Sequence, residues 1–139
     1  MSILRFLPLF VVILIIYNAL ALPGIVDFSG EAQPLFSMGL ISGAVVNVYS
    51  STLLLMVSMF TLYIEILKST KTSVSTIIDH TLSMIVFVVF IVEFLVVKAC
   101  GNQTFFLLIL LSLLDVIAGF TITISTAKRD LTVGDPGLV

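Results

Sequence analysis

Four carboxylates and one histidine lie inside long apolar stretches of this 139-residue chain, and they are the side chains best suited to chemistry. Glu65, Glu93 and Asp115 are isolated acids, whereas Asp79 and His80 are neighbours. A carboxylate in hydrocarbon is costly, so it needs a partner, a proton or a function. The three isolated acids are therefore candidate intramembrane polar sites that could bind a cation or relay a proton.

Asp115 lies at the centre of its apolar run, too far from either end for its short side chain to reach water. Ser112, Gly119 and Thr126 share its helix face, and small or hydroxylated residues on one face are typical of close helix packing in lipid. We prefer the hypothesis that Asp115 is neutral or hydrogen-bonded to Ser, Thr or Asn18 of a neighbouring helix. The alternative hypothesis is ion or proton conduction, although no conduction pathway is visible.

Glu65 shares a helix face with Ser58 and Thr61 and precedes Lys68 by three residues. It lies within one turn of the end of its apolar run. We therefore expect Glu65 to pair with Lys68 and both side chains to reach the membrane interface.

The adjacent Asp79 and His80 form a candidate interface pair. Thr76 and Asp79 match a capping pattern ahead of an apolar run, which predicts that Asp79 caps the third helix. His80 is the only histidine and has no second ligand nearby, so the sequence predicts no metal site. A pH-sensing pair is the less favoured alternative, based on the near-neutral titration of imidazole.

Glu93 is the deepest acid of the third apolar run, and we expect Lys98 or the Asn102-Gln103 turn to stabilise its charge. The single cysteine, Cys100, allows no internal disulfide. Its expected place on the outer side predicts a free thiol or an intermolecular contact.

Four apolar runs must position these side chains, at about residues 3–22, 51–67, 77–97 and 104–126. Each is about as long as a membrane-spanning helix, and 60% of the chain is hydrophobic while only 10% is charged. Continuous rather than alternating apolar runs favour helices over a barrel. The sequence predicts an all-α membrane protein, a four-transmembrane-helix bundle forming one domain over residues 1–139.

The basic residues predict the orientation, because lysine and arginine are retained on the cytoplasmic side of short loops. One face carries five of the six: Arg5, Lys68, Lys71, Lys128 and Arg129. Both termini and the tail at 127–139 are thus expected in the cytoplasm. The net charge of −2 does not suggest nucleic acid as a partner.

The first apolar run has a second interpretation as a cleaved signal peptide comprising residues 1–21. Arg5 would be its basic region, and Ala19-Leu20-Ala21 would be its cleavage site. The length of the run and the nearby Pro23 favour a spanning helix instead.

The outer loop at 23–50 contains two β-prone runs, 35–40 and 44–49, around a turn with Gly43. This arrangement predicts a short β-hairpin. A lone hairpin is marginally stable in water, so it would rest on the helix ends or on a neighbour. An irregular loop whose apolar side chains enter the membrane interface is the alternative.

Segments distributed over most of the chain resemble a family of small bacterial four-helix inner-membrane proteins with no assigned activity. They are residues 65–71, 79–84, 92–96, 114–120 and 127–130. The resemblance implies a four-helix topology in the bacterial cytoplasmic membrane. The outline is also similar to claudin-like tetraspan proteins, although this chain lacks their paired loop cysteines and tryptophan motif.

The sequence thus favours a non-enzymatic structural or accessory subunit that packs against itself or a larger membrane protein, with no cofactor. The alternative is an oligomeric channel or proton-linked transporter component that uses Glu93 and Asp115. A membrane enzyme ranks third, because carboxylates without a metal motif or a nucleophile specify no reaction.

Overall fold

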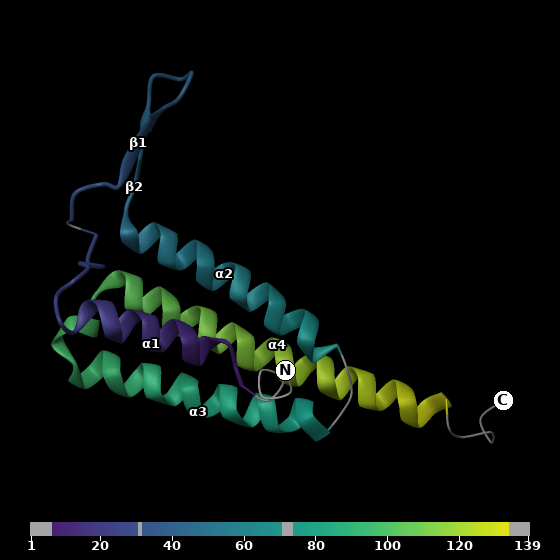
Figure 1. The fold of residues 1–139 in the computed structure, drawn as a ribbon. Coiled ribbons are helices and arrows are strands. Elements are labelled where there is room, and N and C mark those ends of the chain that lie inside the picture. Colours follow the sequence, from purple (N-terminus) through teal and green to yellow (C-terminus); the bar gives the residue numbers. More distant parts are fainter. Residues whose placement is uncertain (1–6, 31, 71–73, 134–139) are drawn as a thin grey trace.

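A computed structural model describes residues 7–30, 32–70 and 74–133 (Figure 1). The elements in chain order are α1 (Phe10–Ala21), β1 (Phe36–Gly39), β2 (Val45–Val48), α2 (Ser50–Ser69), α3 (Val74–Val96), the 3₁₀ turn η2 (Lys98–Cys100) and α4 (Gln103–Val133). The helices form a bundle in which α4 packs against both α2 and α3, while α1 lies against α3 and α2. We call the end that carries the β-strands the hairpin end, and the opposite end the Lys68 end.

Among the described residues, three helices are long and apolar enough to cross a membrane, as the sequence predicts for the last three apolar runs: α2 over Ser50–Ser69, α3 over Ile77–Val96 and α4 over Gln103–Ser125. The first apolar run differs from the expected span. Its helix α1 has 12 residues, or about 18 Å at 1.5 Å per residue, which is shorter than a bilayer core of about 30 Å. The helix begins at Phe10, after Pro8 and the N-cap residue Leu9. Residues 1–6 of the expected span lie outside the described residues.

Helix α4 continues to Val133, so the prediction that the chain leaves the helix near residue 126 is wrong. The reason is that helix formation does not need apolar residues. Ala127, Lys128 and Arg129 are strong helix formers, and the next glycine in the sequence is Gly134. The hydrophobic pattern therefore predicted the end of the apolar run and not the end of the helix.

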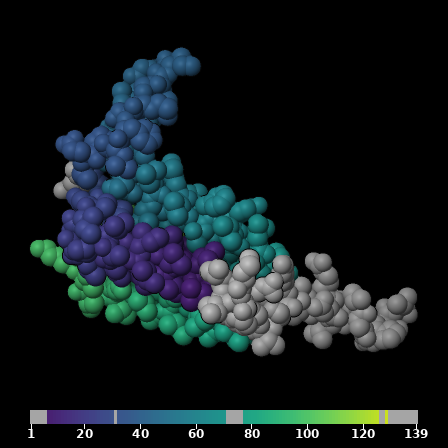
Figure 2. Space-filling view, in the orientation of Figure 1, coloured from purple at the N-terminus to yellow at the C-terminus, as the bar shows by residue number. Residues whose placement is uncertain are grey.

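The predicted β-hairpin is confirmed. Strands β1 and β2 pair antiparallel, with Phe36 opposite Val48 and Met38 opposite Val46. The turn is compatible with its sequence because Gly43 adopts a φ of 83°, which glycine tolerates without steric cost. The hairpin projects away from the helical bundle (Figure 2).

The apolar core contains a cluster of aromatic side chains contributed by α1, α3 and α4. Phe10 and Tyr17 of α1 are fully buried, as are Phe90 of α3 and Phe105 of α4. The Tyr17 and Phe105 rings meet edge to face with centroids 4.7 Å apart, and Phe90 lies 5.4 Å from Phe105. Leu54 of α2 also belongs to this core, whereas the other buried residues of α2, such as Ser58 and Glu65, are polar.

Candidate functional site: a buried ionic cluster at the Lys68 end

Lys68 of α2 joins two acids from different helices. Its Nζ lies 3.0 Å from Glu65 Oε2 and 3.1 Å from Asp79 Oδ1 of α3. The two carboxylate side chains are only 2% and 3% exposed, whereas the Lys68 side chain is 24% exposed. The predicted pairing of Glu65 with Lys68 is thus confirmed. Glu65 is nevertheless buried inside the bundle rather than exposed at the helix end, because the start of α1 packs against its carboxylate.

Glu65 also contacts the start of α1. The Leu9 amide donates a hydrogen bond to Glu65 Oε1, and Lys68 Nζ donates to the Leu7 carbonyl at 3.2 Å. The first amides of a helix lack partners within the helix and carry partial positive charge. A carboxylate placed there satisfies one amide and favours docking of the α1 N-terminus onto α2.

Asp79 does not cap α3, contrary to the sequence prediction. The helix begins at Val74, so Asp79 lies more than one turn inside it and pairs with Lys68 instead. Its neighbour His80 is 2% exposed, and the imidazole Nε2 is hydrogen-bonded to Thr123 Oγ1 of α4 at 3.1 Å. The ring lies directly against Gly119, where a Cβ would be only 2.5 Å from it. Asp79 and His80 are therefore both buried inside the bundle.

Asp115 of α4 completes the cluster. It is 3% exposed, and the Ser83 hydroxyl of α3 is its hydrogen-bonding neighbour. Its Oδ2 is buried and has no hydrogen-bond partner among the described residues. The contact between Asp115 and Ser83 agrees with the preferred hypothesis of a hydrogen bond to a serine of a neighbouring helix. The suggested alternative partner Asn18 is wrong, because its amide donates to Glu93.

The cluster contains more acid than base. The carboxylates of Glu65, Asp79 and Asp115 interact electrostatically with a single lysine, Lys68. Even with His80 protonated, three negative charges would exceed two positive charges. Excess charge buried in a medium of low dielectric is unfavourable. This arrangement can retain a proton or accept a cation, although the described residues contain no group of three His, Cys, Asp or Glu side chains suited to a metal ion.

Glu93 lies apart from this cluster, in the hairpin half. The Asn18 amide of α1 donates to both of its carboxylate oxygens, at 3.0 and 2.8 Å. The expected partners, Lys98 and the Asn102-Gln103 turn, are therefore wrong. A polar residue in the otherwise apolar α1 was the available signal, but its position opposite Glu93 depends on helix packing that the sequence does not show.

Cys100 is a free thiol, as one of the two alternatives predicted, but it is fully buried and so not placed for the other alternative, an intermolecular contact. Its Sγ lies 4.0 Å from Asn18 Oδ1. Burial raises the pKa of the Cys100 thiol to about 11, so the side chain is a neutral thiol at physiological pH.

No known protein family, curated protein or solved structure significantly matches this chain. A functional proposal therefore depends on the fold and its side-chain contacts and surfaces. The sequence did not reveal the pairing of Lys68 with Asp79. A short connection between antiparallel helices brings the last turn of one helix beside the first turns of the next. The short connection between α2 and α3 could therefore have indicated that Lys68 lies near Asp79.

Proposed function

We propose that this chain is a small integral protein of the bacterial cytoplasmic membrane and a non-enzymatic accessory subunit of a membrane assembly. Insertion is supported by the outward faces of the three long helices, which are rich in exposed large apolar side chains. Phe60 of α2 is 67% exposed and Leu95 of α3 is 74% exposed. Such surfaces are unfavourable in water and favourable against lipid.

The proposed orientation places the Lys68 end in the cytoplasm and the hairpin end outside. Lys68 and Lys128 lie toward the first end and Lys98 toward the second, in the sense expected from the retention of basic residues. A cysteine at the exposed hairpin residue Ser42 should react with an impermeant thiol reagent on intact cells. A cysteine at the exposed Lys128 should react only after lysis, and the opposite pattern would reverse the orientation.

The observation that carries the accessory role is the exposed apolar face of the hairpin. Phe36, Met38 and Val46 alternate onto one face and are 54%, 52% and 41% exposed. The opposite face carries Ser37 and Asn47, whose side chains are hydrogen-bonded at 2.7 Å. No charged residue occurs between residues 35 and 49. An isolated two-stranded hairpin is marginally stable in water, so a protein contact on its apolar face would stabilise it.

Purification in mild detergent tests this role. We expect the wild-type chain to retain a membrane protein, either a second copy or a larger subunit, through the apolar hairpin face. Serine at both Phe36 and Met38 should release that protein. Val45→Ser on the opposite face, which removes an equally exposed apolar side chain, is the matched control and should retain it. Equal retention by all three proteins would contradict the proposed contact.

A second function, a proton- or cation-linked component of a transporter or channel, is favoured by the excess of acid in the buried cluster. The measurement is flux through liposomes that contain the purified protein, at pH values between about 5 and 8. A conductor that uses the cluster loses flux with Asp115→Asn and keeps it with Glu93→Gln, because Glu93 is bonded to Asn18 outside the cluster. An accessory subunit gives no flux above that of empty liposomes.

A further inference from the structure

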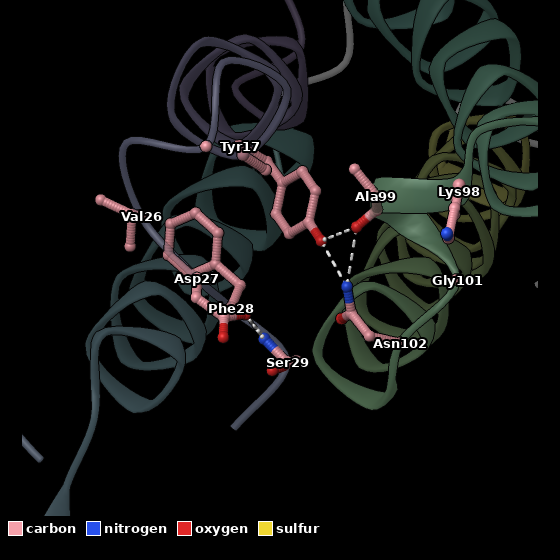
Figure 3. Close-up of a pocket in the computed structure, with 11 residues that line it drawn as sticks. Tyr17, Val26, Asp27, Phe28, Ser29, Lys98, Ala99, Gly101 and Asn102 are labelled. Carbon is pink, nitrogen blue, oxygen red and sulfur yellow. Dashed lines mark hydrogen bonds between the residues drawn. The ribbon is translucent and has the colours of Figure 1, made fainter. Parts of the chain in front are cut away.

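A cavity of about 340 Å³ opens at the hairpin end of the bundle, far from the ionic cluster (Figure 3). Three segments form its walls: the end of α1, the loop from Gly24 to Ser29, and the turn from Lys98 to Asn102. Its volume lies within the range of about 300 to 1,000 Å³ that is typical of small-molecule sites.

A network of hydrogen bonds fixes the base of this cavity. The Tyr17 hydroxyl donates to the Ala99 carbonyl at 2.9 Å and accepts from Asn102 Nδ2 at 2.6 Å (Figure 3). The Tyr17 ring stacks on Phe28 with centroids 5.0 Å apart. The Thr104 hydroxyl donates to the Phe28 carbonyl at 2.6 Å, which holds the loop against the start of α4. The walls are thus positioned without a ligand, as a binding site requires.

The cavity carries one acid and one base from different walls. Asp27 belongs to the loop after α1, and Lys98 belongs to the turn before α4. The Ser29 amide donates to Asp27 Oδ1 at 2.8 Å and lowers the pKa of that carboxyl, so Asp27 is ionised at neutral pH. Within the described part of the chain, both ion pairs involve Lys68, so neither Asp27 nor Lys98 is held in an ion pair, and the hydrogen-bonding partner of the Asp27 carboxylate is the neutral Ser29.

We propose that this cavity binds a dipolar ligand that carries a primary ammonium and a phosphate, the chemistry of a phosphoethanolamine headgroup. The ammonium would donate to Asp27, and the phosphate would accept from Lys98. A purely anionic ligand would be repelled by Asp27, and a quaternary ammonium has no N–H to donate to it.

Two sources offer this headgroup: phosphatidylethanolamine in the membrane and free phosphoethanolamine in solution. The cavity lies beside the ends of the spanning segments of α3 and α4, where lipid headgroups would lie. The lipid source therefore rests on the proposed membrane insertion, whereas the recognition chemistry does not.

Binding to the full chain in detergent micelles tests the inference. The probes are short-chain phosphatidylethanolamine, phosphatidylcholine and phosphatidylglycerol, together with free phosphoethanolamine, and retained ligand is counted by native mass spectrometry. We expect the ethanolamine lipid to bind about tenfold more tightly than the other two lipids, because phosphatidylglycerol lacks the ammonium and phosphatidylcholine lacks the N–H that would donate to Asp27. Free phosphoethanolamine that binds as tightly as the lipid would support a soluble source for the same site.

Variants distinguish the site from general lipid association. Asp27→Asn and Lys98→Gln should each weaken binding of the ethanolamine lipid by about tenfold. Both side chains are exposed, so we expect both variants to fold, and their melting temperatures provide the check. Lys128→Gln, on an exposed lysine at the other end, is the matched control and should bind like the wild type. Equal binding of the three lipids, or wild-type binding by both variants, would overturn the proposal. Because micelle binding needs neither a bilayer nor a hairpin partner, its failure is distinguishable from failure of the proposed accessory role.

Discussion

Substitution of Lys68 by methionine tests whether the ionic cluster depends on this single cation. Methionine keeps an unbranched apolar side chain of similar length while removing the charge that lies 3.0 Å from Glu65 and 3.1 Å from Asp79. Both carboxylates are at least 97% buried, so they cannot turn to solvent without local opening. The variant leaves two buried acids without their shared partner.

We expect Lys68→Met to lower the free energy of unfolding by about 3 kcal/mol. Loss of one partner of a buried ion pair costs about 3 to 5 kcal/mol, and the partial exposure of Lys68 places the cost at the lower end. Neutralising the acids in the same background, with Glu65→Gln and Asp79→Asn, should recover most of this loss. Recovery is expected because the penalty comes from unpaired charge rather than from missing volume.

Reversible unfolding in mixed detergent micelles, followed by circular dichroism, measures these differences. Lys128→Met provides a matched control at an exposed position and should change stability by less than about 0.5 kcal/mol. If Lys68→Met behaves like this control, or if neutralising both acids makes the loss larger, Lys68 does not stabilise the cluster.

Three further results are expected. Gly119→Ala should destabilise the protein by about 1 to 3 kcal/mol because the new methyl group would overlap the buried His80 ring. In a His80→Ala background, the same substitution should destabilise the protein much less. Equal losses of stability in both backgrounds would show that the His80 ring is not the obstacle. Asn18→Leu should destabilise by about 1 to 3 kcal/mol because it removes both hydrogen bonds to the half-buried Glu93, and an unchanged unfolding curve would argue against that contact. Cys100 should react with a maleimide at pH 8 only as the protein unfolds. The pKa of the Cys100 thiol is about 11 in the folded protein and exceeds its ordinary value of 9.0, so the native state keeps a proton that the unfolded state loses. The free energy of unfolding should therefore fall as the pH rises from about 9 to 11. A flat stability profile over this pH range would contradict the burial of a neutral thiol.

The parts of the fold that follow from local sequence were predictable. A continuous apolar run requires a helix in lipid, which located the three candidate spanning segments to within a few residues. The turn around Gly43 and its β-prone flanks located the hairpin. The contact of Glu65 with Lys68 follows from i,i+3 spacing on one helix.

Contacts between helices were not predictable in the same way. The sequence placed Glu93 beside the nearby Lys98, but its partner Asn18 is 75 residues away. It treated Asp79 as a cap, because the pattern Thr-x-x-Asp does not reveal that the helix had already begun at Val74. The partner of a buried acid depends on how each helix is rotated about its axis and how far it is shifted along the bundle. A single sequence does not state either quantity directly.

The most direct test of the accessory role is photo-crosslinking in the native membrane from the tip of the hairpin. A photoreactive residue at Ile41, which is fully exposed, is compared with one at Met59 on the outward face of α2, which is 62% exposed. We expect a discrete protein adduct from position 41 that disappears when Phe36 and Met38 are changed to serine, and only lipid adducts from position 59. Lipid adducts alone from position 41, or a protein adduct that persists in the serine variant, would contradict the proposal that the hairpin joins this chain to a membrane assembly.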